Sequence, residues 1–175
     1  REQEYQQGHI PNAINLPLAK LLADDSAESI QKIAQDLGIS DETSVAIYDD
    51  TFGALSSRVV WALQYIGHKD AKLLDVTFSQ WILLGYETST EVPEIESSTH
   101  SVNINPEIMA TAEYLEKVKE NKNVVIIDNR ERLNYLEQHI PGAINIPYRT
   151  LAMEGKILRT REGMKNLLKN RGISE

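Results

Sequence analysis

Three sets of side chains in this sequence have types and spacing that could do chemistry. Asp49 and Asp50 follow one short apolar run, and Asp128 and Arg130 follow another. Because ligands of parallel α/β sheets bind at the carboxyl ends of the strands, both places are candidate sites. The third set consists of two histidines, each of which opens one copy of a repeated stretch of nine residues.

The repeated stretch reads His-Ile-Pro-Asn-Ala-Ile-Asn-Leu-Pro at residues 9–17 and His-Ile-Pro-Gly-Ala-Ile-Asn-Ile-Pro at residues 139–147. Seven of the nine positions are identical, and the copies start 130 residues apart. A match at a domain-sized period predicts two copies of one domain. His9 and His139 invite a catalytic interpretation, but they belong to the repeat itself. We therefore expect each ring to bond to the backbone and fix the turn.

Asp49 heads a loop that leads from a predicted buried strand into the start of a helix. Backbone N–H groups in such a loop favour an anion and would lower the pKa of a thiol. Two adjacent carboxylates, Asp49 and Asp50, repel an anion at low effective dielectric. We interpret this loop as a structural remnant. At the other strand end, Arg130 either pairs with Asp128 or points into a cleft and binds a substrate anion.

The composition excludes several classes of protein and site. The chain has 175 residues, 41% hydrophobic and 25% charged, which are ordinary globular values, and a net charge of −8. This charge argues against a nucleic-acid or membrane-surface partner, and no apolar run approaches the ~20 residues of a membrane span. The sequence contains no cysteine, which excludes disulfides, thiolate metal sites and a cysteine nucleophile within it. The composition fits a reducing compartment, so we predict a cytoplasmic location and no metal site.

Hydrophobic periodicity predicts an α/β fold with a parallel sheet flanked by helices, because strands and helices alternate along the chain. We expect a polar turn before residue 9, His68 as a helix C-terminal cap, and both tryptophans in the core. The expected strands are 14–18, 44–48, 72–75 and 124–128, and the expected helices are 26–37, 56–66, 78–84, one opening at 105–106, and 161–169.

The repeat also predicts the domain organisation. We expect a first domain at 1–88 that lacks its first strand, a linker at 89–102 containing His100, and the first half of a second domain at 103–175. On this interpretation the chain is a piece of a longer two-domain protein, clipped at both ends.

These residues resemble the rhodanese family, in the tandem arrangement of the thiosulfate and 3-mercaptopyruvate sulfurtransferases. The resemblance rests on the doubled His-Ile-Pro-x-Ala-Ile-Asn-x-Pro signature and covers nearly the whole chain. Further matching stretches are Tyr48-Asp-Asp, Ser57-Arg-Val-Val-Trp61, Gly67-His68, Phe78-Ser-Gln-Trp81 and Asp128-x-Arg130.

The resemblance implies a non-catalytic first domain, in which Asp49 takes the place of the cysteine, and a catalytic second domain whose cysteine carries a persulfide. The stretch Gly-Ile-Ser recurs at residues 38 and 172, and this offset of 134 residues places that cysteine near residue 183, about eight residues beyond Glu175. Phe78 matches an aromatic residue that borders the cleft. Substrate binding would involve Arg130 and, where the family tends to have a second arginine, either Asn134 or its neighbour Arg132.

Val76-Thr77 also replaces the usual Gly-Gly before Phe78, so the local turn can differ from the family's. The resemblance implies a small-molecule sulfur donor, thiosulfate or 3-mercaptopyruvate, a cyanide or thiol acceptor, and no cofactor. Because Asn134 stands where the family tends to have a second arginine, the choice between the two donors stays open.

Three hypotheses follow. The first is a tandem sulfurtransferase, of which this segment lacks the nucleophile and is therefore inactive. The second is a cysteine-free binding or regulatory module. The third is a related cysteine phosphatase with a longer loop, which the doubled signature disfavours. The clipped sheets also predict a homodimer formed by strand exchange.

Overall fold

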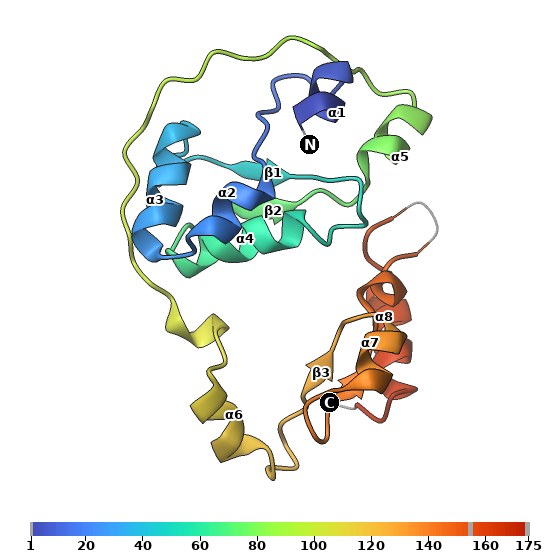
Figure 1. Cartoon of the computed structure of the whole chain (residues 1–175). Coiled ribbons are helices and arrows are strands. Elements are labelled where there is room, and N and C mark those ends of the chain that lie inside the picture. The colour runs from blue at the N-terminus through green and yellow to red at the C-terminus, as the bar shows by residue number, and fades with distance from the viewer. Residues whose placement is uncertain (1, 154–155, 174–175) are drawn as a thin grey trace. The chain divides into compact units, whose positions relative to one another are not determined.

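The structure, a computed structural model, describes residues 2–153 and 156–173. The chain forms two compact units, Arg1–Ile108 and Met109–Glu175 (Figure 1). Each unit is described by itself below.

The first unit contains a parallel pair of strands surrounded by helices (Figure 1). Strands β1 (Val45–Ile47) and β2 (Ala71–Leu73) pair in parallel, with Val45 opposite Ala71 and Ile47 opposite Leu73. Helix α4 (Ser56–Tyr65) connects them. The remaining elements are α1 (Glu2–Gln7), α2 (Leu18–Ala23), α3 (Ala27–Asp36), α5 (Phe78–Leu83) and the 3₁₀ turn η1 (Pro106–Ile108).

The core of the first unit comes mainly from the apolar faces of α2, α3 and α4. Helix α3 begins at Ser26, whose hydroxyl accepts a hydrogen bond from the Ser29 amide at 3.2 Å, and it ends before Gly38, which has a φ of 71°. Its stripe at helical spacing faces inward. The buried cluster comprises Leu21, Ala27, Ile30, Ala34, Ile39, Ala62, Leu63, Ile66 and Ala71.

An extended segment, residues 86–105, runs along the first unit from α5 to η1 and is called the strap below (Figure 1). It includes residues 89–102, for which we predict a linker. Backbone hydrogen bonds tie it down at several points: Ser89 to His9, Ser98 to Gln35, Asn103 to Ile66 and Asn105 to Tyr65, at 2.8 to 3.0 Å. The strap therefore lies within the first compact unit.

Gly67 shows how closely the strap approaches the end of α4. Its φ of 93° lies in the left-handed region, which lets the chain turn after the helix. A Cβ at this position would collide with the backbone carbonyl of Asn103 in the strap. Only glycine allows both the turn and the contact.

The second unit contains the other parallel pair. Strand β3 (Ile127–Asp128) pairs with β4 (Ile144–Asn145), with Ile127 opposite Ile144. Helices α6 (Ala112–Val118) and α7 (Arg132–Glu137) flank β3 in sequence. The 3₁₀ turn η2 (Tyr148–Leu151) and helix α8 (Arg161–Lys169) follow β4. The prediction of a helix at 161–169 is confirmed.

Several local predictions are wrong. Residues 2–7 form helix α1 instead of a turn, and residues 14–17 form no strand, although their counterpart in the second unit is β4. Both tryptophans are half-buried: Trp61 packs against the core cluster, whereas Trp81 does not belong to it. The helix predicted to open at Asn105-Pro106 does not form. These residues lead only into the turn η1, and α6 begins separately after its cap, Thr111.

Candidate functional site

The loop after β1 wraps around the carboxylate of Asp49. Its Oδ1 accepts hydrogen bonds from the amides of Thr51 at 2.8 Å and Gly53 at 2.9 Å. Its Oδ2 accepts from the amides of Leu55 and Ser56, both at 2.8 Å, and from the Ser56 hydroxyl at 3.1 Å. Four backbone N–H groups and one hydroxyl thus converge on one carboxylate. This arrangement is an anion-binding cradle whose anion is the chain's own side chain.

The cradle explains how α4 starts. We predict Ser56 or Ser57 as its cap, but the residue before the helix is Leu55, whose side chain makes no capping bond. The Asp49 carboxylate instead accepts from the amides of Leu55, at the cap position, and of Ser56, the first residue of α4. Phe52 and Gly53, with φ of 56° and 81°, carry the loop through its turn in the left-handed region.

The protonation of Asp49 follows from these contacts. Partial burial of the carboxyl raises its pKa, but the amides of Ser56, Gly53, Thr51 and Leu55 stabilise the charged form more strongly. The net effect is a pKa below the ordinary value for aspartate. Asp49 is therefore a stable anion at neutral pH.

Asp50 turns away from the cradle and binds α5. Its two carboxylate oxygens accept from the Ser79 amide at 3.0 Å and the Ser79 hydroxyl at 2.6 Å. The amide of Phe78 donates to the Asp49 carbonyl at 3.2 Å, and the Phe78 ring lies 6.0 Å from that of Tyr48. Phe78 is half-buried beside the Asp49 loop. The start of α5 is thus fixed against this strand end.

At the end of β3, Arg130 pairs with Asp128. The Arg130 Nε lies 3.1 Å from both carboxylate oxygens, and Nη2 lies 2.6 Å from Oδ2. Nη2 also donates to the Gln138 carbonyl at 2.6 Å. The side-chain hydrogen bond of Arg130, against the opposing effect of burial, holds the pKa of Asp128 below its ordinary value. We left open whether Arg130 pairs with Asp128 or points into a cleft, and the structure shows the ion pair with Asp128.

The other two candidates in the second unit are exposed residues of α7. Arg132 is its first residue, and Asn134 is its third. Phe78 belongs to the first unit. The described residues therefore place the three polar candidates on one short segment, residues 130–134, and the aromatic one beside Asp49.

The repeated histidines make backbone contacts, as predicted. His9 Nδ1 lies 2.8 Å from the Tyr5 carbonyl and His139 Nδ1 lies 2.8 Å from the Tyr135 carbonyl. The tyrosine rings stack on the histidine rings at 3.9 Å in both copies. The Tyr5 hydroxyl donates to the Ala13 carbonyl at 2.7 Å, and the Tyr135 hydroxyl to the Ala143 carbonyl at 2.9 Å. Sequence reasoning missed this tyrosine, although it recurs four residues before each histidine.

Comparison with known proteins identifies what these repeated features belong to. The family model for the rhodanese-like domain matches residues 1–83 and 111–171, once in each unit. The chain belongs to the rhodanese-like family.

Individual rhodanese-like relatives match across both units. The sulfur carrier protein TtuD of Thermus thermophilus is 27% identical and aligns with 98% of this chain and 69% of its own length. The thiosulfate sulfurtransferase of Rattus norvegicus is 22% identical and aligns with 98% of this chain and 65% of its own length. The chain thus spans about two thirds of these relatives.

The fold is that of the 3-mercaptopyruvate sulfurtransferase SseA from Escherichia coli. That crystal structure matches with a TM-score of 0.88 at 23% sequence identity, covering 99% of this chain and 71% of SseA. The match confirms the predicted rhodanese-like α/β fold.

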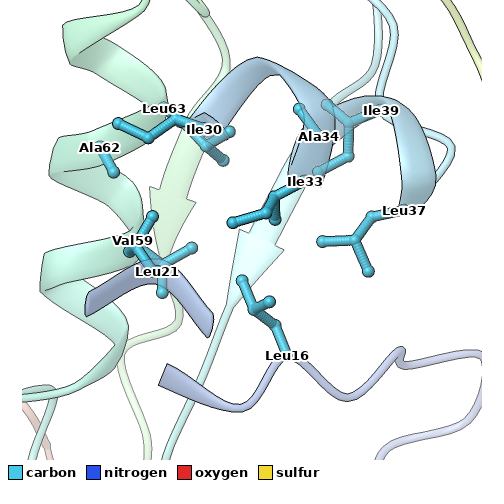
Figure 2. A pocket seen from close by; sticks show the side chains of 10 residues that line it. All are labelled: Leu16, Leu21, Ile30, Ile33, Ala34, Leu37, Ile39, Val59, Ala62 and Leu63. Carbon is cyan, nitrogen blue, oxygen red and sulfur yellow. The ribbon is translucent and has the colours of Figure 1, made fainter. Parts of the chain in front are cut away.

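The remaining features of the two rhodanese-like units supply no further candidate. Figure 2 shows a pocket between α2, α3 and α4 lined by ten aliphatic residues, so it belongs to the core. Within residues 2–153 and 156–173, no cluster of histidine, cysteine and acidic residues could hold a metal ion. In that same part of the chain, no helix is long and apolar enough to cross a bilayer.

Two further histidines lie at the end of α4 and in the strap. His68 and His100 are buried, and His68 Nδ1 lies 3.1 Å from His100 Nε2. We predict His68 as a C-terminal cap of α4, and its amide donates to the Leu63 carbonyl at 2.9 Å. We predict His100 within a linker, and it lies in the strap. Their side chains join the end of α4 to the strap, and the Asp41 carboxylate lies 3.8 Å from His100 Nδ1.

Proposed function

We propose that this chain is the non-catalytic first unit of a tandem rhodanese sulfurtransferase together with the beginning of its catalytic unit. The intact protein would move sulfane sulfur from thiosulfate or 3-mercaptopyruvate to cyanide or a thiol. The observation that carries the proposal is the Asp49 cradle, because a loop of this kind suits a charged sulfur and here is filled by a carboxylate. The nucleophile would then lie outside residues 1–175.

In the proposed reaction, a cysteine thiolate attacks the sulfane sulfur of thiosulfate, the S–S bond breaks and sulfite leaves. The resulting persulfide gives its outer sulfur to cyanide as thiocyanate, or to an acceptor thiol. A second cradle, formed by the equivalent loop near residue 183, would stabilise the charged sulfur. The domain limits that go with this proposal are 1–88, a connecting segment 89–102, and 103–175.

The donor would meet residues 130–134. Arg130 is half-exposed at its side chain while paired with Asp128, so it can keep the ion pair and still present a cationic edge. Arg132 and Asn134 are exposed on α7, and Phe78 would border the cleft. Asn134 has no charge to offer a carboxylate or sulfonate, so Arg132 is the better candidate for binding the donor's anionic group.

The test is a sulfurtransferase assay of residues 1–175 beside the full-length product of the same gene. We expect no turnover from residues 1–175 with thiosulfate and cyanide, and turnover with one of the two donors from the longer protein. The heat-treated proteins are the control. If the folded full-length protein shows no turnover with either donor, this result would favour the alternative, a cysteine-free binding or regulatory module. The acidic, cysteine-free composition fits a cytoplasmic setting for either function.

We further propose that residues 1–175 can dimerise by strand exchange. Each unit holds one two-stranded parallel sheet, and the two sheets derive from different parts of the repeated sequence. Exchange between two copies would combine them. Sedimentation equilibrium would show a concentration-dependent dimer, whereas a compact monomer at every concentration would contradict this proposal.

A further inference from the structure

His9 is buried with both ring nitrogens against carbonyl oxygens. Its side chain is among the most deeply buried in the first unit, with 1% exposure. Nδ1 lies 2.8 Å from the carbonyl oxygen of Tyr5, and Nε2 lies 3.0 Å from the carbonyl oxygen of Glu91. Tyr5 belongs to α1 and Glu91 to the strap, so the ring bridges two segments far apart in sequence.

Backbone carbonyl oxygens only accept hydrogen bonds. A neutral imidazole carries one N–H and one bare nitrogen, so it can satisfy only one of the two contacts. The other would place two lone pairs against each other at about hydrogen-bond distance. An imidazolium carries an N–H on both nitrogens and satisfies both.

We propose that His9 is held as a doubly protonated imidazolium that fastens the strap to α1, and that the fastening loosens when the ring loses one proton. The proposal rests on the geometry of the His9 ring and does not depend on sulfur transfer.

The surroundings of His9 suit a buried cation. Both N–H groups have an acceptor, which removes most of the cost of taking the charge out of water. The Tyr5 ring stacks at 3.9 Å with an interplanar angle of 15°, which offers the cation a π face. The formal charge of −8 also favours keeping a cation in this chain. The titratable side chains on the two segments that hold the ring are mostly acidic: Glu2, Glu4 and Tyr5 on α1, and Tyr86, Glu87, Glu91, Glu94, Glu96 and His100 on the strap.

The strap is held near the His9 ring by further hydrogen bonds of Ser89 and Glu91. Next to the Glu91 carbonyl, the amides and carbonyls of His9 and Ser89 exchange two hydrogen bonds at 2.8 Å. The Ser89 hydroxyl accepts from the Glu91 amide at 2.9 Å, which fixes the local turn. Loss of the bond to Glu91 would leave the Ser89 bridge to hold this end of the strap.

The second repeat provides an internal control. His139 has the same Nδ1 contact and the same stacked tyrosine, but the residue is exposed. In the described part of the chain, its Nε2 has no hydrogen-bond partner. A neutral ring with its proton on Nδ1 satisfies His139 completely, so the two histidines should differ in protonation although their local sequences match.

The direct test is nitrogen NMR of the histidine rings in the full chain, with assignment through the ring-to-backbone connections and by His139→Gln. At a pH where His139 shows one protonated and one bare nitrogen, His9 should show two protonated nitrogens. A bare nitrogen on His9 at that pH would overturn the proposal.

The second readout is amide exchange at Ser89, corrected for the intrinsic dependence on pH. The bond that protonation adds is charge-assisted, and its loss should raise local opening roughly tenfold to a hundredfold as pH rises across about 5 to 8. His139→Gln should leave this change intact, since it lies in the other unit. Exchange at Ser89 that stays constant across this range after correction would also contradict the proposal.

Discussion

Replacing Asp49 by alanine is expected to lower the free energy of unfolding of the first unit by about 2 to 3 kcal/mol. The substitution removes the acceptor of four backbone N–H groups and of the Ser56 hydroxyl. Hydrogen bonds to a charged group contribute about 1.5 to 3 kcal/mol each, and partial access of water to the loop offsets much of the sum. Urea unfolding followed by tryptophan fluorescence reports this unit, because Trp61 and Trp81 both lie in it.

Asp50→Ala is the matched control for Asp49→Ala. It removes a neighbouring carboxylate that binds only Ser79 and is exposed. We expect a loss of less than about 1 kcal/mol. Equal losses for the two variants would show that the cradle has no special role in stability.

The hydrogen bonds to the Asp49 carboxylate also predict that the stability of the first unit falls at acidic pH. Because the pKa of Asp49 is lower in the folded chain than its ordinary value, the stabilisation is complete above the ordinary range of aspartate. It is lost as the pH falls below about 4 and through the lowered pKa. In Asp49→Asn this contribution to the acid transition should be absent, which a pH series of thermal melts would measure.

Leu21→Ala is expected to destabilise the first unit by about 3 kcal/mol. Leu21 is 1% exposed and lies in the cluster formed with Ile30 and Ile66. Leu21 itself lines the aliphatic pocket of Figure 2, so removing its branched end enlarges this pocket and takes away contacts with the other lining side chains.

Leu22→Ala provides the comparison for Leu21→Ala within the same helix. Leu22 is 60% exposed, so its truncation should change the free energy of unfolding by less than about 0.5 kcal/mol. Similar midpoints in urea for the two variants would mean that α2 does not pack as described.

The elements that sequence predicted well are those with strong periodicity or clear ends. The α3 stripe, the serine cap and the apolar run that becomes β1 all carry local signals. Helix α1 was missed because Glu2–Gln7 has no apolar stripe, and its stability comes from contacts such as Tyr5 against His9. Residues 14–18 were predicted as a strand because they alternate, but no neighbouring strand pairs with them among the described residues, and Leu18 begins α2.

The predicted site was incomplete for a different reason. We expected the N–H groups of the loop to favour a bound anion and the two carboxylates to repel it, but not that the carboxylate of Asp49 would itself be the bound anion. Asp49 takes the cradle and Asp50 binds Ser79, a partner 29 residues away that no local pattern indicates. The burial of His100 was also missed, since its partner His68 lies 32 residues earlier in the chain.

The proposed position of the nucleophile after Glu175 is tested by the mass of the full-length protein after incubation with thiosulfate and removal of excess donor. We expect one added sulfur atom, carried by a peptide that follows Glu175, and none on residues 1–175. Cyanide should remove that sulfur. A folded full-length protein that gains no sulfur from thiosulfate or 3-mercaptopyruvate, or that gains it within residues 1–175, would contradict the account.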